Sequence, residues 1–315
     1  MKNTTLWLTA LLVFSPCALQ AQTAQFVTVD KDVKLQVLDW GGTGRPLLFL
    51  TGLGNDAHVY DRLAPKFTAK YHVYGITRRG FGASSKPAPT TANYNADRLG
   101  DDVLAVIDAL KLNRPILVGH SIAGEELSSI GSRHPEKIAG LIYLDAGDGY
   151  GFYDRVHGDW MLDMLDLRKR IDEIEAGAVL NHQFTQDMLA SVSQLEKSLH
   201  EVDKQVASMP SSPPPPPPIP MAIRFGEQKY TAIHAPALAI FACPHNFDRA
   251  FPDNSKAKAT MVANDLAHCT AQSNAFEAGI PSAPVVRIRN ADHYVFNSNE
   301  AEVIQAMNTF LAKLP

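Results

Sequence analysis

The chain has 315 residues, of which 45% are hydrophobic and 20% are charged. This length and composition are typical of a globular protein with one large domain, or one domain and an insertion. The formal charge of −4 argues against nucleic acid or an anionic membrane surface as a partner. The sequence has no cysteine cluster of zinc-ligand spacing and no dinucleotide fingerprint, so it predicts neither a metal nor a dinucleotide cofactor.

The N-terminal residues 1–21 differ from the rest of the chain and predict a secretory signal peptide. Lys2 supplies a positive start, residues 6–14 are apolar, and small residues follow as far as Ala21. The apolar run is shorter than the ~20 residues that a membrane-spanning helix needs. The mature chain would begin near Gln22, remain outside the membrane, and be periplasmic or secreted. The alternative is an anchoring or buried N-terminal helix.

Cys243 and Cys269 remain after this predicted processing. An oxidising compartment permits a disulfide between them. Pairing cannot be deduced from the sequence, so two free, buried thiols are an equal alternative.

Strand-like and helix-like segments alternate along most of the chain. Strand patterns occur at 33–40, 46–52, 71–77, 115–120, 139–147, 236–242 and 283–290. Helical patterns occur at 56–69, 98–111, 122–133, 255–278 and 299–313. This alternation predicts an α/β fold whose mostly parallel central sheet is covered by helices on both faces.

Residues 148–233 interrupt the alternation and predict a helical lid inserted between two parts of the core, 22–147 and 234–315. Two apolar stripes recur at helical spacing and are interpreted as core-facing: Trp160, Met164, Leu167, Ile171 and Ile174, then Leu189, Val192, Leu195, Leu199, Val202 and Val206. The proline-rich segment 210–220 cannot continue a helix and favours polyproline II. We interpret it as a spacer or exposed loop, with a docking site for a partner as the alternative.

Ser121 lies in "ILVGHSIAGEELSS" (116–129), where a strand pattern passes directly into a helix pattern. A hydroxyl is a weak nucleophile until a base takes its proton. A tight turn can hold it clear of the backbone, provided that the residues two before and two after it are small. Gly119 and Ala123 meet this condition, in the pattern G-x-S-x-G with alanine at the last place. Ser121 is therefore the predicted nucleophile, and a helix-capping serine is the alternative.

Two further segments supply the groups that such a serine needs. A glycine-rich turn, "LTGLGNDAHVY", follows an apolar strand pattern, and we expect the backbone N–H groups of Leu53 and Ile122 to stabilise an oxyanion. Gly52 and His120 are candidates to line the substrate site. His293 follows the last strand pattern, and open α/β sheets build their sites at the carboxyl ends of strands. His293 is therefore the predicted base.

These motifs and their order resemble the α/β-hydrolase family, in its serine-nucleophile branch with a helical lid. The resemblance covers about residues 25–147 and 234–315, and "TRRGFGASSKP" (77–87) is similar to the family's loop after the fourth strand. The chain departs from the family at Ala123 and at Thr77, where an acidic residue is common. The tight strand-to-helix turn that carries the nucleophile in this family is called the nucleophile elbow. A serine at this elbow argues against the family's epoxide hydrolases and haloalkane dehalogenases, which use aspartate there.

The resemblance implies an acid that orients His293, and two positions compete for it. The family's acid most often follows the seventh strand, where its usual position falls near His245 and Asp248 lies slightly later. The second option is the end of the sixth strand, where Asp145 lies. We prefer Asp248 by a small margin on location, keep Asp145 as a near-equal rival, and take Asp253 as the next candidate. A purely structural role is the alternative for Asp145 and for Asp248.

The sequence therefore predicts an exported serine hydrolase of carboxylesterase type. It would cleave a small carboxylic ester or lactone through an acyl-enzyme intermediate, without a cofactor. A binding or sensor protein with little turnover is one alternative, and a cofactor-free perhydrolase is another. The sequence specifies neither the substrate nor the oligomeric state.

Overall fold

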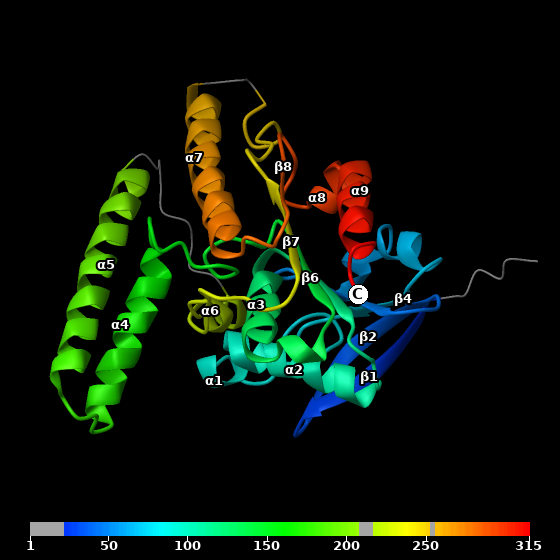
Figure 1. Ribbon diagram of the computed structural model, residues 1–315, viewed down its shortest axis with the longest axis horizontal. Helices are drawn as coiled ribbons and strands as arrows, with labels where there is room; N and C mark the ends of the chain where they lie inside the picture. The colour runs from blue at the N-terminus through cyan, green and yellow to red at the C-terminus, as the bar shows by residue number, and fades with distance from the viewer. Residues whose placement is uncertain (1–21, 208–216, 253–255) are drawn as a thin grey trace, which may run out of the picture.

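The computed structural model describes residues 22–207, 217–252 and 256–315, and shows one eight-stranded sheet with helices on both faces (Figure 1). The strand order is β1-β2-β4-β3-β5-β6-β7-β8. The strands are β1 (Thr23–Asp30), β2 (Val33–Gly41), β3 (Pro46–Leu50), β4 (His72–Ile76), β5 (Ile116–His120), β6 (Gly140–Leu144), β7 (Ala237–Ala242) and β8 (Val285–Ile288). β2 pairs antiparallel with β1 and β4, and all the other pairs are parallel. The predicted fold class is confirmed.

The continuous apolar runs of the central strands supply two separate cores, one on each face of the sheet. Successive side chains of a strand point to opposite faces. Leu48 and Leu117 accordingly pack with α2 (Ala96–Ala109) and α3 (Gly124–Arg133). Phe49 and Val118 pack on the other face, with α9 (Glu300–Leu311). Burial on both faces explains why these strands lack polar alternation.

Three further helices cover the sheet; the sequence predicted the long one, at 255–278, and neither of the two short ones. α7 (Lys256–Gly279) lies on the same face as α2 and α3, and the short α1 (Thr91–Tyr94) and α8 (Val295–Ser298) precede α2 and α9. The segment 56–69 holds two short 3₁₀ helices, Ala57–Tyr60 and Ala64–Phe67, instead of one continuous helix. Pro65 lies at the start of the second 3₁₀ helix, where a missing N–H costs least.

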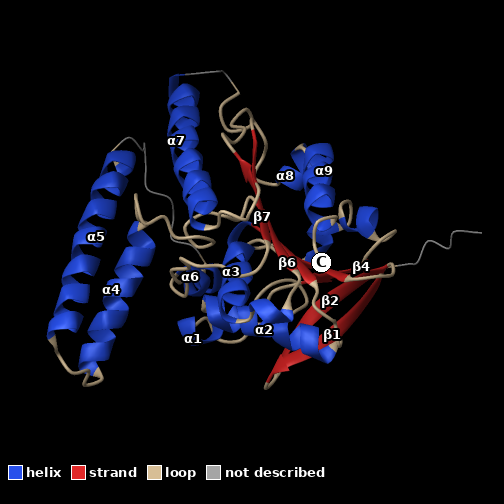
Figure 2. Cartoon of the chain, viewed as in Figure 1, coloured by secondary structure: helices blue, strands red, loops and turns tan. Residues whose placement is uncertain are grey.

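The insertion between β6 and β7 is helical in the residues that the structure describes. It contains α4 (Trp160–Glu175), α5 (His182–Val206) and α6 (Pro218–Arg224). α4 and α5 pack against each other as a hairpin at one side of the molecule (Figure 2). The proline-rich segment lies mostly outside the described residues, and its role stays a prediction, as does the role of the insertion as a lid.

The expectation that both apolar stripes of the insertion face a core is wrong for part of each stripe. Ile171 and Ile174 on α4 are exposed, as are Leu189, Val192 and Leu199 on α5. The prediction assumed that the core of the main domain covers both stripes. In the structure, α4 and α5 pack mainly against each other. The start of α4 is covered, since Leu162 and Asp163 are buried, whereas these five apolar side chains are exposed.

The N-terminal segment 1–21, with the predicted signal peptide, lies outside the described residues. Within the described part of the chain, every helix is too short or too polar to cross a membrane.

Candidate active site

Ser121 sits on a strained turn between β5 and α3. Its backbone φ is 55°, in the left-handed region that non-glycine residues rarely adopt. A Cβ atom at Gly119 would lie 2.9 Å from Leu127, and one at Gly124 would lie 1.9 Å from the Ala146 carbonyl oxygen. The Leu127 side chain therefore accounts for glycine at 119, and the close approach of the Ala146 backbone accounts for glycine at 124. The turn presents the Ser121 side chain at the carboxyl edge of the sheet.

Asp145 and His293 meet at the same edge of the sheet. Asp145 follows β6, His293 follows β8, and the His293 Nδ1 donates a hydrogen bond of 2.7 Å to Asp145 Oδ2. Asp145 Oδ1 accepts a second hydrogen bond, 2.9 Å long, from the Ala242 N–H. Burial opposes ionisation of Asp145, but hydrogen bonds from His245 and His293 outweigh it and lower the pKa of Asp145 to about 2. Asp145 is therefore ionised at any ordinary pH and can orient the His293 ring.

Asp248 does not meet His293. Its carboxylate is 60% exposed and forms an ion pair with Lys258. The preference for Asp248 is thus corrected by the geometry, and the acid position passes to Asp145. The loop after β7 turns Asp248 outward, and its inward position is occupied by His245, whose Nε2 donates to Asp145 Oδ2 at 2.7 Å. Asp253, the next candidate, lies outside the described residues.

The glycine-rich turn after β3 contacts His120, which precedes Ser121, and Tyr294, which follows His293. His120 is buried, and its Nε2 donates a 3.0 Å hydrogen bond to the His293 carbonyl oxygen. A Cβ at Gly52 would lie 2.8 Å from His120 Nδ1, so only glycine fits there. The Tyr294 hydroxyl donates to Asn55 Oδ1 at 3.1 Å and ties the two loops together. Gly52 and His120 therefore pack against each other and stabilise the site. Neither residue lines the pocket beside Asp145 and His293, which is described below.

His120 is excluded as a competing base by its surroundings. Burial and the neighbouring His293 lower the pKa of His120 to about 4. Its ring packs 4.7 Å from the rings of both His293 and Tyr294, measured between centroids. His120 is thus neutral at working pH and occupied by a structural hydrogen bond.

The two expected oxyanion donors remain available in this arrangement. Among the described residues, the Leu53 N–H has no hydrogen-bond partner. Ile122 lies in the 3₁₀ turn Ser121–Ala123 that begins the helix, where N–H groups have no partner within the helix. Both amides can therefore serve as donors, although their role stays a prediction.

A pocket of about 380 Å³, counting its opening to solvent, adjoins the Asp145–His293 pair. It is lined by Asp145, Asp148, Tyr150, Phe241, His245, His268, Cys269, Gln272 and His293. The Tyr150 hydroxyl shares a hydrogen bond with the Ser121 side chain, and burial together with Asp148 and Asp145 raises the pKa of Tyr150 well above its usual range. Tyr150 thus stays protonated and connects Ser121 to the pocket.

The disulfide left open by the sequence is present between Cys243 and Cys269. It joins the loop after β7 to α7. The pocket wall formed by α7 is therefore attached covalently to the strand end beside the acid.

Asp145, His245 and His293 each present a possible metal-ligand atom, and these atoms lie within 4.8 Å of one another. The same atoms hydrogen bond among themselves at 2.7 Å, which satisfies all three groups. We therefore assign the group to hydrogen bonding and place no ion there.

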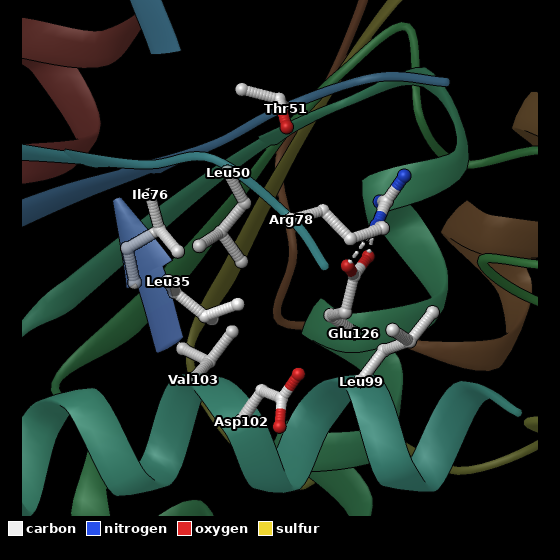
Figure 3. Close-up of a pocket in the computed structure, with 9 residues that line it drawn as sticks. All are labelled: Leu35, Leu50, Thr51, Ile76, Arg78, Leu99, Asp102, Val103 and Glu126. Carbon is white, nitrogen blue, oxygen red and sulfur yellow. Dashed lines mark hydrogen bonds and ion pairs between the residues drawn. The ribbon is translucent and has the colours of Figure 1, made fainter. Parts of the chain in front are cut away.

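A second pocket, lined in part by Arg78 and Glu126, contains a buried ion pair. Figure 3 shows Arg78 beside Glu126 of α3, with dashed lines between the two side chains. Arg78 Nε donates to Glu126 Oε1 at 2.6 Å, and Nη2 donates to Oε2 at 2.8 Å. Both side chains are almost fully buried. This two-bond pair fixes the loop after β4 against the helix that begins at the elbow.

Sequence reasoning missed Tyr150, Asp265 and Gln272 and gave His245 no role. Each of these residues reaches the site from an element whose position depends on the tertiary fold. One signal was available in the sequence, because His245 occupies the place after the seventh strand where the resemblance implies a carboxylate.

Residues 45–299 match the family model described as alpha/beta hydrolase fold. The match covers most of the chain, and the chain belongs to the α/β-hydrolase family.

Individual relatives resemble only part of the chain in sequence. A fluoroacetate dehalogenase from Burkholderia sp. is 34% identical over 118 residues, which are 37% of this chain and 39% of that protein. The 3-oxoadipate enol-lactonase 2 of Acinetobacter baylyi is 32% identical over 122 residues, which are 38% of this chain and 45% of that protein. The chain thus spans less than half the length of these curated relatives.

Solved structures resemble nearly the whole chain at low sequence identity. The E-2-(acetamidomethylene)succinate hydrolase structure superposes with a TM-score of 0.57 at 20% identity, covering 93% of this chain and all of that one. A bromoperoxidase from Bacillus anthracis gives 0.60 at 17% identity, covering 92% and 100%. At this identity the likeness shows the fold.

Proposed function

We propose that the chain is an exported serine hydrolase that cleaves a small carboxylic ester or lactone. The hydrogen bond from His293 to Asp145, at the sheet edge that also presents Ser121, carries the proposal. Ester and lactone substrates are supported by the serine at the elbow and by the lactonase among the relatives. The family's dehalogenases use aspartate at the elbow, so a dehalogenase among the relatives does not carry that activity to Ser121.

The reaction uses the three groups in sequence. Ser121 Oγ attacks the acyl carbonyl while His293 Nε2 takes its proton, and Asp145 stabilises the resulting imidazolium. The Leu53 and Ile122 amides bind the oxyanion. The imidazolium gives its proton to the leaving alkoxide, and the acyl-enzyme forms. Water then attacks the acyl-enzyme with His293 as base, which releases the acid and restores Ser121.

The pocket beside the acid suggests which substituents such a substrate carries. Gln272 is 5% exposed, and its Oε1 has no hydrogen-bond partner among the described residues. Asp148 in the same pocket forms an ion pair with His268 at 3.0 Å. Apolar surface comes from Phe241 and the disulfide. A short acyl chain that carries a hydroxyl or amide N–H donor would therefore fit this pocket better than a long alkyl chain.

The proposal of export has its own support. The Cys243–Cys269 disulfide is typical of proteins from oxidising compartments. N-terminal sequencing of the protein recovered from the periplasm or medium tests cleavage near residue 21. Recovery of the uncleaved chain in the cytosol would contradict export.

The experiment that tests the reaction is mass-spectrometric mapping of a fluorophosphonate label, followed by turnover of p-nitrophenyl acetate. We expect labelling at Ser121, its loss in Ser121→Ala, and many turnovers per enzyme in the wild type. Ser193→Ala, on the exposed side of α5, is the matched control and should behave as the wild type. Labelling that survives Ser121→Ala would refute the nucleophile. Stoichiometric labelling without turnover would favour a sensor.

A perhydrolase is the second candidate, because a haloperoxidase and a bromoperoxidase occur among the similar proteins. Both reactions share the acyl-enzyme and differ in whether water or hydrogen peroxide releases it. Peracid formation from acetate or an ester in the presence of peroxide, at a rate above ester hydrolysis, would favour the perhydrolase.

A further inference from the structure

The carboxylate of Asp145 is held by two histidines at one oxygen. Asp145 Oδ2 accepts a hydrogen bond from His293 Nδ1 and another from His245 Nε2, each 2.7 Å long. The proposed mechanism uses His293 and leaves His245 without a function. His245 nevertheless contacts the acid as closely as the base does.

His245 lies between two carboxylates. Its Nε2 faces Asp145, and its Nδ1 lies 2.9 Å from Asp265 Oδ1 on α7. Its backbone N–H also donates to Asp265 Oδ2, at 2.6 Å. A neutral imidazole has one N–H and could donate to only one of the two carboxylates, whereas an imidazolium donates to both. The geometry therefore calls for the charged form of His245.

The titration of His245 agrees with this geometry. Burial disfavours the charged ring, but the hydrogen bonds to Asp145 and Asp265 outweigh it and raise the pKa of His245 to about 10. Asp265 on α7 contacts His245 directly, and the titratable groups that line the same pocket as His245 come from three segments: Asp145, Asp148 and Tyr150 after β6, His268 on α7, and His293 after β8.

One disulfide and one ion pair hold the loop that carries His245 against α7. Cys243, two residues before His245, is bonded to Cys269, which lies one helical turn after Asp265 on α7. The disulfide and the His245–Asp265 pair thus join the same loop to the same helix. This double attachment keeps the ring directed at Asp145.

We propose that His245 is a positioning residue: a permanent imidazolium that holds the Asp145 carboxylate and keeps His293 neutral. This inference rests on the proposed serine hydrolase function. The positive charge of His245 offsets part of the negative charge of Asp145. That negative charge would otherwise stabilise a protonated His293. The charge on His245 thus opposes a second positive charge on the neighbouring His293 ring, which leaves His293 free to accept the Ser121 proton.

The size of the effect follows from the spacing of the two rings. Their centroids lie 6.0 Å apart. Two unit charges at this distance shift a pKa by roughly 0.5 to 2 units for effective dielectric constants of about 80 to 20. Loss of the charge on His245 should therefore move the acid limb of kcat/KM to higher pH by an amount in this range.

Two substitutions separate charge from hydrogen bonding. His245→Gln keeps a neutral N–H donor near Asp145, and we expect the acid limb of kcat/KM to rise by roughly 0.5 to 2 units. Asp265→Asn removes the second carboxylate, so His245 loses its proton at lower pH and the acid limb should rise similarly. The surface variant His234→Gln is the matched control and should leave the profile unchanged.

A readout that does not depend on activity separates this proposal from the proposed function. ¹⁵N–¹H spectra of the histidine rings should show both His245 nitrogens protonated at pH 8 in the wild-type protein, and the second proton should be lost in Asp265→Asn. A neutral His245 at pH 7 would overturn the proposal even if Ser121 is the nucleophile. An unshifted acid limb in folded His245→Gln, with or without lower stability, would also overturn it. Absence of any turnover in the wild type would refute the proposed function, and the spectra would still decide the charge of His245.

Discussion

Replacing Asp145 by asparagine tests the site most directly, because the substitution keeps the shape of the side chain and removes its charge. Asp145 is the acceptor for both His293 Nδ1 and His245 Nε2. Asparagine offers an amide in place of one carboxylate oxygen, so the His293 tautomer needed for catalysis loses its acceptor. In a well-studied serine protease triad the same change costs roughly 10⁴ in turnover. We expect a loss of that order, about 5 kcal/mol of transition-state stabilisation.

The same substitution should lower stability, and the structure gives the amount. The Asp145 side chain is 6% exposed, and its pKa falls from the ordinary value of 3.8 to about 2. This difference corresponds to about 2 kcal/mol of folding free energy. Because the folded-state pKa is depressed, this contribution is complete above pH 4 and is lost as the pH falls through 2. Asp145→Asn should therefore be about 2 kcal/mol less stable than the wild type at pH 7.

Asp248→Asn is the matched control for this experiment. Its exposed ion pair with Lys258 contributes less than about 1 kcal/mol. Turnover of p-nitrophenyl acetate and urea unfolding should be measured on both variants. If Asp145→Asn keeps more than a tenth of wild-type turnover, or if Asp248→Asn loses as much, the assignment of the acid is refuted.

Three further predictions concern the framework of the site. Cys243→Ser, or reduction of the wild type, should lower stability by about 3 kcal/mol, because the disulfide to Cys269 closes a loop of 26 residues; an unchanged urea midpoint would contradict this. Glu126→Gln should cost roughly 3 to 5 kcal/mol, because it leaves the buried Arg78 charge unpaired, and a midpoint equal to that of the wild type would show that the pair contributes nothing. Replacing the α4–α5 hairpin (160–206) by a short Gly-Ser linker should retain fluorophosphonate labelling and change the preference among esters of graded acyl length; an unchanged preference would argue against a lid.

The sequence by itself determined the features that depend on local geometry. A buried strand reads as a continuous apolar run, as β3 and β5 do, and the parallel sheet follows from their alternation with helices. The elbow at Ser121 is equally local, because the small residues that the turn requires are its immediate neighbours. The Leu127 side chain and the Ala146 carbonyl oxygen leave no room for a Cβ atom at Gly119 and Gly124.

Only the tertiary structure decided which groups surround His293. Asp145 and Asp248 both follow core strands, so sequence position favoured neither strongly. The direction of the β7 loop turns Asp248 into solvent and brings His245 onto Asp145. The exposed apolar residues of the α4–α5 hairpin were likewise misassigned, because a stripe shows which side of a helix is apolar without showing whether anything covers it. Contacts between segments a hundred or more residues apart depend on strand order and loop direction, and neither is recorded in the local pattern of residues.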